Sequence, residues 1–165
     1  MSVSIVMGSD SDFPIVESAI DVLKKNGIAY DINVISAHRS PDKALAFAQG
    51  AVKKGTKIII AFAGSAAHLA GVIASHTIIP VIGVPVPSSD IKGLDALLST
   101  VQMPSGVPVA TMGLGKAGAV NAAILAMQIL SLSDSTLQKK LEEHKKELAQ
   151  KVDAAEKRVK DKCKE

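Results

Sequence analysis

Residues 57–68 read KIIIAFAGSAAH, an apolar run that passes directly into a turn of small residues and ends at a histidine. After its first residue, Lys57–Phe62 is continuously apolar instead of alternating with polar residues, which is typical of a strand covered on both faces. Similar short runs lie at Ser4–Met7, Ile32–Ile35, Val81–Val84 and Val107–Thr111. The sequence therefore predicts an α/β fold with a parallel sheet of about five strands between two layers of helices.

Helical patterns separate these strands, at residues 13–26, 41–54, 66–76, 93–101 and 115–132. Ser40 and Pro41 suit the cap and first turn of a helix, and Gly27 and Gly55 stand where left-handed helix ends belong. Strands and helices that alternate with right-handed crossovers predict a three-layer α/β domain over residues 1–132.

Residues 133–165 are predicted to form a separate C-terminal helix, at about 135–160. Its apolar residues recur at spacings of four and seven among charged ones: Leu137, Leu141, Leu148, Val152 and Val159. Such a narrow stripe predicts that this helix packs on the domain or on a neighbouring subunit. With the Ala-rich helix before it, the stripe predicts a homo-oligomer.

Composition excludes several classes of protein. The pI is near 9.0, but residues 134–165 interleave ten basic with eight acidic residues, and aromatic residues make up only 2%, so we expect no nucleic-acid partner. Cys163 is the single cysteine, which excludes an intramolecular disulfide and fits a reducing cytoplasm. No secretory signal is visible, and Lys116 interrupts the apolar region 113–132, so we expect no membrane partner.

Three polar turns follow predicted strands: residues 8–12 (GSDSD), 36–41 (SAHRSP) and 63–68 (AGSAAH). Because ligands of parallel α/β sheets bind beyond the carboxyl ends of the strands, we expect these turns to share one site. Arg39 offers a planar fork of donors for an anion, and the neighbouring His38 exchanges protons near neutral pH. The turns predict a phosphorylated ligand with ribose hydroxyls and a second, small anionic group.

Taken alone, each turn also has a structural interpretation. Ser11 or Asp12 could cap the following helix, and His68 could be a histidine satisfied within the core. The sequence contains no dinucleotide-binding GxGxxG motif, no Walker phosphate loop and no metal-binding motif such as HExxH or CxxC. We therefore expect no metal and no cofactor.

Six motifs together resemble the family of N5-carboxyaminoimidazole ribonucleotide mutases. In chain order they are GSDSD, SAHRSP, AGSAAHLAG, GVPV, QMPSGVPV and GKAGAVNA, and the resemblance covers roughly residues 2–132 and the tail helix. It implies a flavodoxin-like sheet and a homo-octamer with four-fold symmetry and active sites built between subunits. It also implies an isomerase of purine (IMP) synthesis, which moves a carboxylate from nitrogen to a ring carbon of aminoimidazole ribonucleotide.

The resemblance implies a role for each turn. Ser9, Ser11 and Arg39 would bind the phosphate, Asp12 the ribose hydroxyls, and His38 would be the general acid and base. The carboxylate and base pocket would be lined by Ser36, Ala37, Gly64, Ser65, Ala66, Ala67, His68 and Leu69.

Two positions depart from the family pattern, because Ser65 stands where the mutases commonly have Gly and Ala70 where they commonly have Pro. Arg39 and His68 favour the mutase over its sister subclass, which carboxylates aminoimidazole ribonucleotide directly with carbon dioxide. That subclass typically has Lys at position 39 and lacks the His at position 68. The direct carboxylase stays an alternative, as does a nucleotide- or flavin-binding module without activity.

Overall fold

The computed structural model describes residues 2–163. Met1, Lys164 and Glu165, which the predicted ranges 1–132 and 133–165 include, lie outside the described residues. The chain divides into two compact units, Met1–Ala126 and Met127–Glu165.

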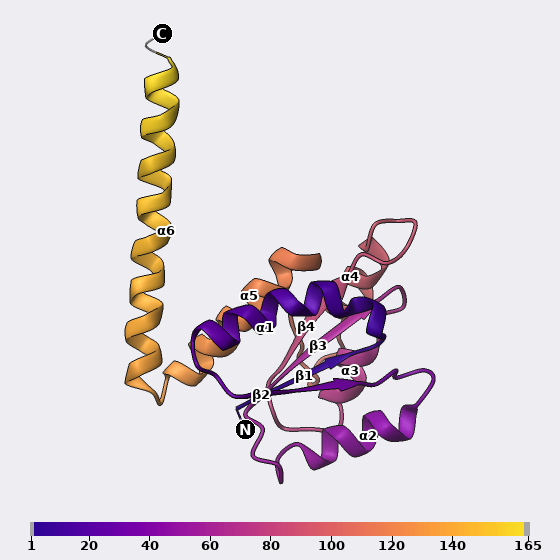
Figure 1. Cartoon of the computed structure of the whole chain (residues 1–165). Helices are drawn as coiled ribbons and strands as arrows, with labels where there is room; N and C mark the ends of the chain where they lie inside the picture. The colour runs from indigo at the N-terminus through magenta and orange to yellow at the C-terminus, as the bar shows by residue number, and fades with distance from the viewer. Residues whose placement is uncertain (1, 164–165) are drawn as a thin grey trace. The chain divides into compact units, whose positions relative to one another are not determined.

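The first unit is built on a five-stranded parallel sheet in the order β2-β1-β3-β4-β5 (Figure 1). Its strands are β1 (Val3–Met7), β2 (Tyr30–Val34), β3 (Ile58–Gly64), β4 (Val81–Val86) and β5 (Ala110–Thr111). In the register of the sheet, Ile5 of β1 lies between Ile32 of β2 and Ile60 of β3. This is the flavodoxin-like order, and its topological switch point lies between β1 and β3.

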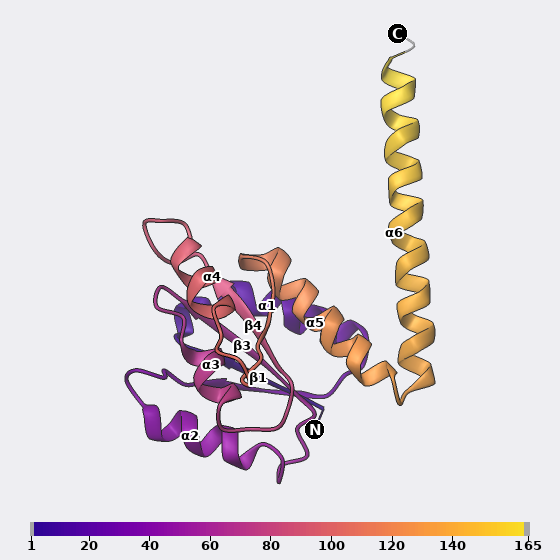
Figure 2. The ribbon, with the colours of Figure 1, turned by 180° about the vertical axis from the view of Figure 1, so that it is seen from behind.

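Helices cover both faces of this sheet (Figures 1 and 2). One face carries α1 (Phe13–Lys25) and the start of α5 (Gly115–Ser131), and the other carries α2 (Pro41–Gly50), α3 (Leu69–Ala74) and α4 (Leu94–Val101). A Cβ added at Gly83 of β4 would meet Ala70 of α3 and Thr100 of α4, whereas a Cβ added at Gly118 of α5 would meet the next residue of the strand, Val84. The predicted three-layer architecture is confirmed.

The central strands form the core. Val3, Ile5, Ile60, Phe62 and Ile82 are all completely buried. Burial on both faces explains why these strands are continuous apolar runs, since an alternating strand would place polar groups against a helix. Gly27 and Gly55 have φ values of +71° and +77°, as their predicted place at left-handed helix ends requires.

Two strands differ from the prediction. Ile32 and Val34 of β2 are 43% and 47% exposed, so this strand is not covered on both faces. The reason is its place at the edge of the sheet, where it pairs with β1 on one side only. The predicted strand Val107–Thr111 is shorter in the structure, where β5 contains only Ala110 and Thr111. Pro108, in the part that does not form a strand, has no N–H to donate to a neighbouring strand.

Two helix starts differ as well. The helix expected from residue 66 begins at Leu69, because the N–H groups of Ala67 and His68 donate to the carbonyls of Ser65 and Ala66, two residues back, which is not a helical pattern. Ser40 is the N-cap residue of α2 and Pro41 lies in its first turn, as predicted, but the Ser40 side chain makes no capping hydrogen bond, because its hydroxyl donates to the carbonyl of Ser36 at 2.9 Å.

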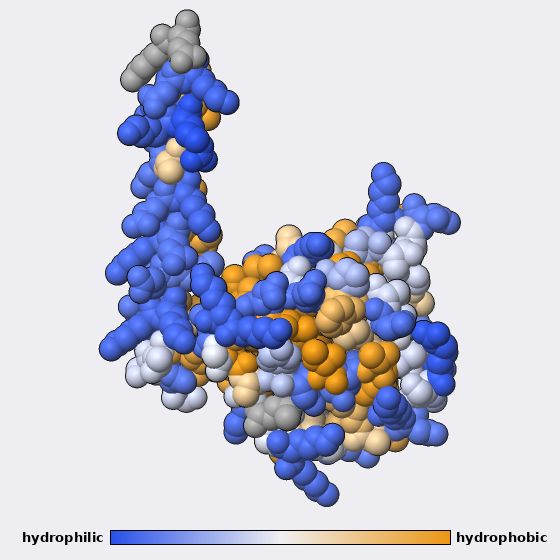
Figure 3. Space-filling view, in the orientation of Figure 1, coloured by the Kyte–Doolittle hydropathy of each residue, from blue (hydrophilic) through white to orange (hydrophobic). Residues whose placement is uncertain are grey.

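The second unit consists of the end of α5 and the helix α6 (Ser135–Lys162). Asp134 caps α6 by accepting hydrogen bonds from the N–H groups of Thr136 at 2.9 Å and Leu137 at 3.2 Å. The surface of α6 is largely hydrophilic (Figure 3), and Val152 and Val159 of its apolar stripe are 69% and 61% exposed. Within residues 2–163, no helix is both long and apolar enough to span a membrane.

Candidate active site

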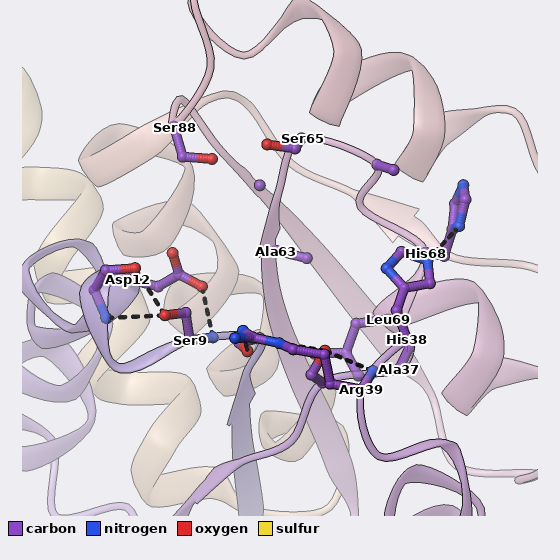
Figure 4. A pocket seen from close by; sticks show the side chains of 15 residues that line it. Ser9, Asp12, Ala37, His38, Arg39, Ala63, Ser65, His68, Leu69 and Ser88 are labelled. Carbon is purple, nitrogen blue, oxygen red and sulfur yellow. Dashed lines mark hydrogen bonds between the residues drawn. The ribbon is translucent and has the colours of Figure 1, made fainter.

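The carboxyl ends of β1, β2, β3 and β4 bring four loops around one pocket of about 410 Å³ (Figure 4). Its lining includes twelve of the thirteen residues that the sequence and the resemblance indicate. The exception is Ala67, which is 1% exposed and lies in the core behind the pocket wall. Three further residues line the pocket: Gly8, Ala63 and Ser88.

A capping box holds the loop after β1: the side chains of Ser9 and Asp12 each accept a backbone hydrogen bond from the other end of one turn. Ser9 is the N-cap of a single 3-10 turn, η1 (Asp10–Asp12), and its own N–H donates to Oδ2 of Asp12 at 3.2 Å. The hydroxyl of Ser11 donates to that of Ser9 at 2.9 Å, so the two hydroxyls lie side by side at the pocket. Ser9 therefore caps η1 with its side chain, while Asp12 occupies the N-cap position of α1 without a side-chain hydrogen bond to that helix, and Ser11 caps neither.

Asp12 is the carboxylate of the pocket and is 5% exposed. Burial raises its pKa above the usual range; the hydrogen bond from the Ser9 N–H opposes this rise, and the nearby charge of Asp10 adds to it. An ionised carboxylate has more acceptor sites than this one bond uses. Asp12 can therefore accept hydrogen bonds from two hydroxyl groups of a ligand.

Among the described residues, Arg39 is the only Lys or Arg that lines the pocket. Its Nη2 reaches the carbonyl of Gly8 and its Nε reaches the hydroxyl of Ser36, both at 3.5 Å, which is long for a hydrogen bond. A guanidinium has five N–H donors, so most of them are available to an anion. This side chain and the hydroxyls of the β1 loop form the cationic end of the pocket.

His38 and His68 are hydrogen-bonded to each other. His38 Nε2 lies 2.8 Å from His68 Nδ1, with the two rings nearly perpendicular at 86°. In a neutral pair, one of these nitrogens carries the shared proton and the other accepts it. Nδ1 of His38 makes no hydrogen bond to another group of residues 2–163. His68 is exposed and paired, so its interpretation as a core histidine is wrong.

A family model described as AIR carboxylase matches residues 2–151 of the chain. The chain belongs to the AIR carboxylase family. Two relatives are both called N5-carboxyaminoimidazole ribonucleotide mutase. That of Bacillus subtilis (strain 168) is 52% identical over 150 residues, covering 91% of this chain and 93% of the relative. That of Pyrococcus horikoshii is 48% identical over 157 residues, covering 95% and 88%.

The fold of this AIR carboxylase family member is also that of a solved structure. The crystal structure of Treponema denticola PurE matches with a TM-score of 0.80 at 31% identity. The match covers 92% of this chain and 93% of that chain.

The three residues that sequence reasoning missed differ in how well they could have been found. Gly8 and Ala63 belong to the quoted turns, so extending the site to every residue of a turn would have included them. Ser88 follows β4, and no sequence pattern distinguishes it from the neighbouring Ser89, whose hydroxyl instead donates to Asp95 at 2.8 Å. Within residues 2–163, no three His, Cys, Asp or Glu side chains are grouped so that they could hold a metal ion.

Proposed function

We propose that this member of the AIR carboxylase family is an N5-carboxyaminoimidazole ribonucleotide mutase of de novo purine synthesis. The observation that carries the proposal is one pocket that combines a single arginine, paired serine hydroxyls, a carboxylate and a histidine pair. Relatives about half identical over nine tenths of the chain have this name.

The pocket suits a ribonucleotide from end to end. Arg39 with the hydroxyls of Ser9 and Ser11 binds the phosphate, because a guanidinium and hydroxyl donors match its oxygens. Asp12 accepts from the ribose hydroxyls. The base then lies against the small residues that follow β2 and β3, which are Ser36, Ala37, Gly64, Ser65, Ala66, His68 and Leu69.

In the proposed reaction, His38 moves one proton. The protonated imidazole gives its proton to the carbamate nitrogen, the N–C bond breaks with its electron pair on nitrogen, and carbon dioxide is released within the pocket. The ring carbon of aminoimidazole ribonucleotide then attacks the carbon dioxide. The neutral imidazole removes the proton from that ring carbon, which restores the aromatic ring and the starting state of His38.

Retaining carbon dioxide is the main demand on the pocket. A free gas molecule diffuses away unless the wall around it is closed, and small residues such as Gly64 and Ala66 let the ligand approach the backbone closely. Holding both fragments together supplies the effective concentration for the second bond, and excluding water limits premature protonation.

A substrate comparison tests the function. The purified protein is mixed with fresh N5-carboxyaminoimidazole ribonucleotide without ATP or bicarbonate, or with aminoimidazole ribonucleotide and bicarbonate, beside buffer controls. We expect saturable formation of 4-carboxy-5-aminoimidazole ribonucleotide in the first mixture. Saturable conversion only in the second mixture would instead assign the direct carboxylase.

The proposal includes a cytoplasmic homo-octamer, in which active sites lie between subunits and α6 packs on the domain or on a neighbouring subunit. Its support is the resemblance, the exposed free thiol of Cys163, which suits a reducing compartment, and the exposed apolar residues of α6.

A further inference from the structure

Two serine hydroxyls lie at the end of the pocket formed by β3 and β4. Ser65 follows β3 and Ser88 follows β4, and their hydroxyls point toward each other in Figure 4. Neither hydroxyl makes a hydrogen bond to another part of residues 2–163, whereas those of Ser9 and Ser11 are bonded to each other. Two free donors at one end of a polar pocket are suited to bind an anion.

Ser65 is held in an unfavourable backbone conformation. Its φ is +53°, and among the described residues only one other non-glycine residue, Lys92, has a positive φ. Gly takes this conformation without strain, whereas a side chain is disfavoured there. Strained residues cluster at functional sites, so the conformation of Ser65 motivates a test of its side chain in this pocket.

The backbone beside Ser65 makes room for Ser88. A Cβ added at Gly64 would lie 1.9 Å from Oγ of Ser88, far closer than any real contact. The hydroxyl of Ser88 therefore lies directly over the Cα of Gly64, and only glycine at position 64 allows it to enter the pocket here.

The sheet order separates these hydroxyls from the cationic end. The guanidinium of Arg39 reaches the carbonyl of Gly8 at the end of β1, while Ser65 and Ser88 follow β3 and β4, one and two strand spacings of about 5 Å farther along the sheet. A ribonucleotide whose phosphate binds Arg39 therefore extends its base toward the two serines. The ring of His38 also lies at the β3 loop, where it contacts His68.

On the basis of the proposed function, we propose that the hydroxyls of Ser65 and Ser88 bind the carboxylate that the reaction moves. Each hydroxyl donates one hydrogen bond to a carboxylate oxygen, which is a strong, charge-assisted contact. Because both donors are neutral, they hold the carboxylate without adding a second cation to the pocket. The pair makes the site selective for the carboxylated nucleotide over the decarboxylated one.

The test measures binding of two nucleotides by calorimetry: 4-carboxy-5-aminoimidazole ribonucleotide and 5-aminoimidazole ribonucleotide. We expect Ser65→Ala, Ser65→Gly and Ser88→Ala each to bind the carboxylated nucleotide about ten-fold more weakly, the loss typical of one hydrogen bond to a charged group. Binding of the decarboxylated nucleotide stays within about two-fold of the wild type. Ser105→Ala, an exposed serine outside the pocket, is the control.

Comparing the two substitutions at position 65 distinguishes the effect of the lost hydroxyl from the effect of backbone strain. Ser65→Gly removes the strain as well as the hydroxyl, so we expect its Tm to exceed that of Ser65→Ala by about 2–4 °C. Their affinities for the carboxylated nucleotide should nevertheless be equal. Normal affinity in Ser65→Gly with loss only in Ser65→Ala would overturn the proposal, because the backbone would then be the cause.

Two other results would also overturn it. One is unchanged affinity of the Ser65 and Ser88 variants for the carboxylated nucleotide; the other is an equal loss for both nucleotides, which a merely structural role produces. A wild-type protein that binds neither nucleotide would overturn the proposed function and this inference together.

Discussion

At the scale of single residues, His38 carries the proposed chemistry. His38→Asn removes the imidazole, so we expect kcat to fall at least 100-fold, within the range of about 10²–10⁴ typical of acid–base catalysis. Binding of the product nucleotide should change little, because the phosphate and ribose contacts are elsewhere in the pocket. Steady-state rates and calorimetric Kd values measure the two effects separately.

A second histidine provides the control. His76 lies outside the proposed active site and is hydrogen-bonded to Ser75 and to the carbonyl of Val72, and His76→Asn should leave kcat unchanged. Near-normal turnover of His38→Asn would remove His38 from the mechanism.

Asp12 links the pocket to the pH dependence of stability. Burial raises its folded pKa above the ordinary 3.8, so in the interval between these values the folded protein binds more protons than the unfolded chain. The contribution of this group to the free energy of unfolding is therefore fully present below pH 3.8 and is lost as the pH rises through the folded pKa.

Asp12→Asn removes this titration and keeps an oxygen that can accept from Ser9. We expect the variant to gain stability relative to the wild type as the pH rises from about 4, and the difference to level off above the folded pKa. Urea unfolding at several pH values measures it. A difference that shrinks or stays constant with rising pH would contradict this prediction.

At the scale of elements, glycine marks where β4 and its helices approach most closely. A Cβ at Gly83 would lie 2.5 Å from Cγ2 of Thr100 and 2.9 Å from Cγ1 of Val109. Gly83→Ala should therefore reduce the free energy of unfolding by about 1–3 kcal/mol, the usual cost of overpacking a core. Urea unfolding measures the change.

Gly50, at the end of α2, is the matched comparison, because an added Cβ there meets nothing within 4 Å. Gly50→Ala should stabilise the protein by up to about 1 kcal/mol, since alanine loses less conformational freedom in a helix. Equal effects at positions 50 and 83 would show that packing does not decide the outcome.

At the scale of the whole molecule, the prediction is the proposed octamer. Sedimentation equilibrium should give eight times the mass of the 17.1 kDa chain. If the stripe of α6 packs between subunits, replacing both Leu148 and Val152 with Lys should lower that mass, because buried unpaired charges are unfavourable. Lys146→Ala, on the opposite side of the helix, is the control. A monomeric wild type would contradict the octamer, and an octameric double variant would place the stripe outside the subunit interfaces.

Local sequence patterns predict the architecture and most of the pocket. The continuous apolar run Ile58–Phe62 predicts a strand buried on both faces, and Gly27 and Gly55 predict left-handed backbone at helix ends. Both features depend on residues that are close together in the sequence. The polar turns likewise identified nearly all of the pocket lining, since the carboxyl ends of parallel strands meet at one edge of the sheet.

Which side chains contact each other depends on the three-dimensional fold. β2 is exposed because it lies at the edge of the sheet. His38 pairs with His68 because the loops after β2 and β3 converge. Ser88 lies against Gly64 because β3 pairs with β4. These contacts join residues between 24 and 30 positions apart. Local propensity cannot report them, because they depend on strand order and on the path of each crossover through space.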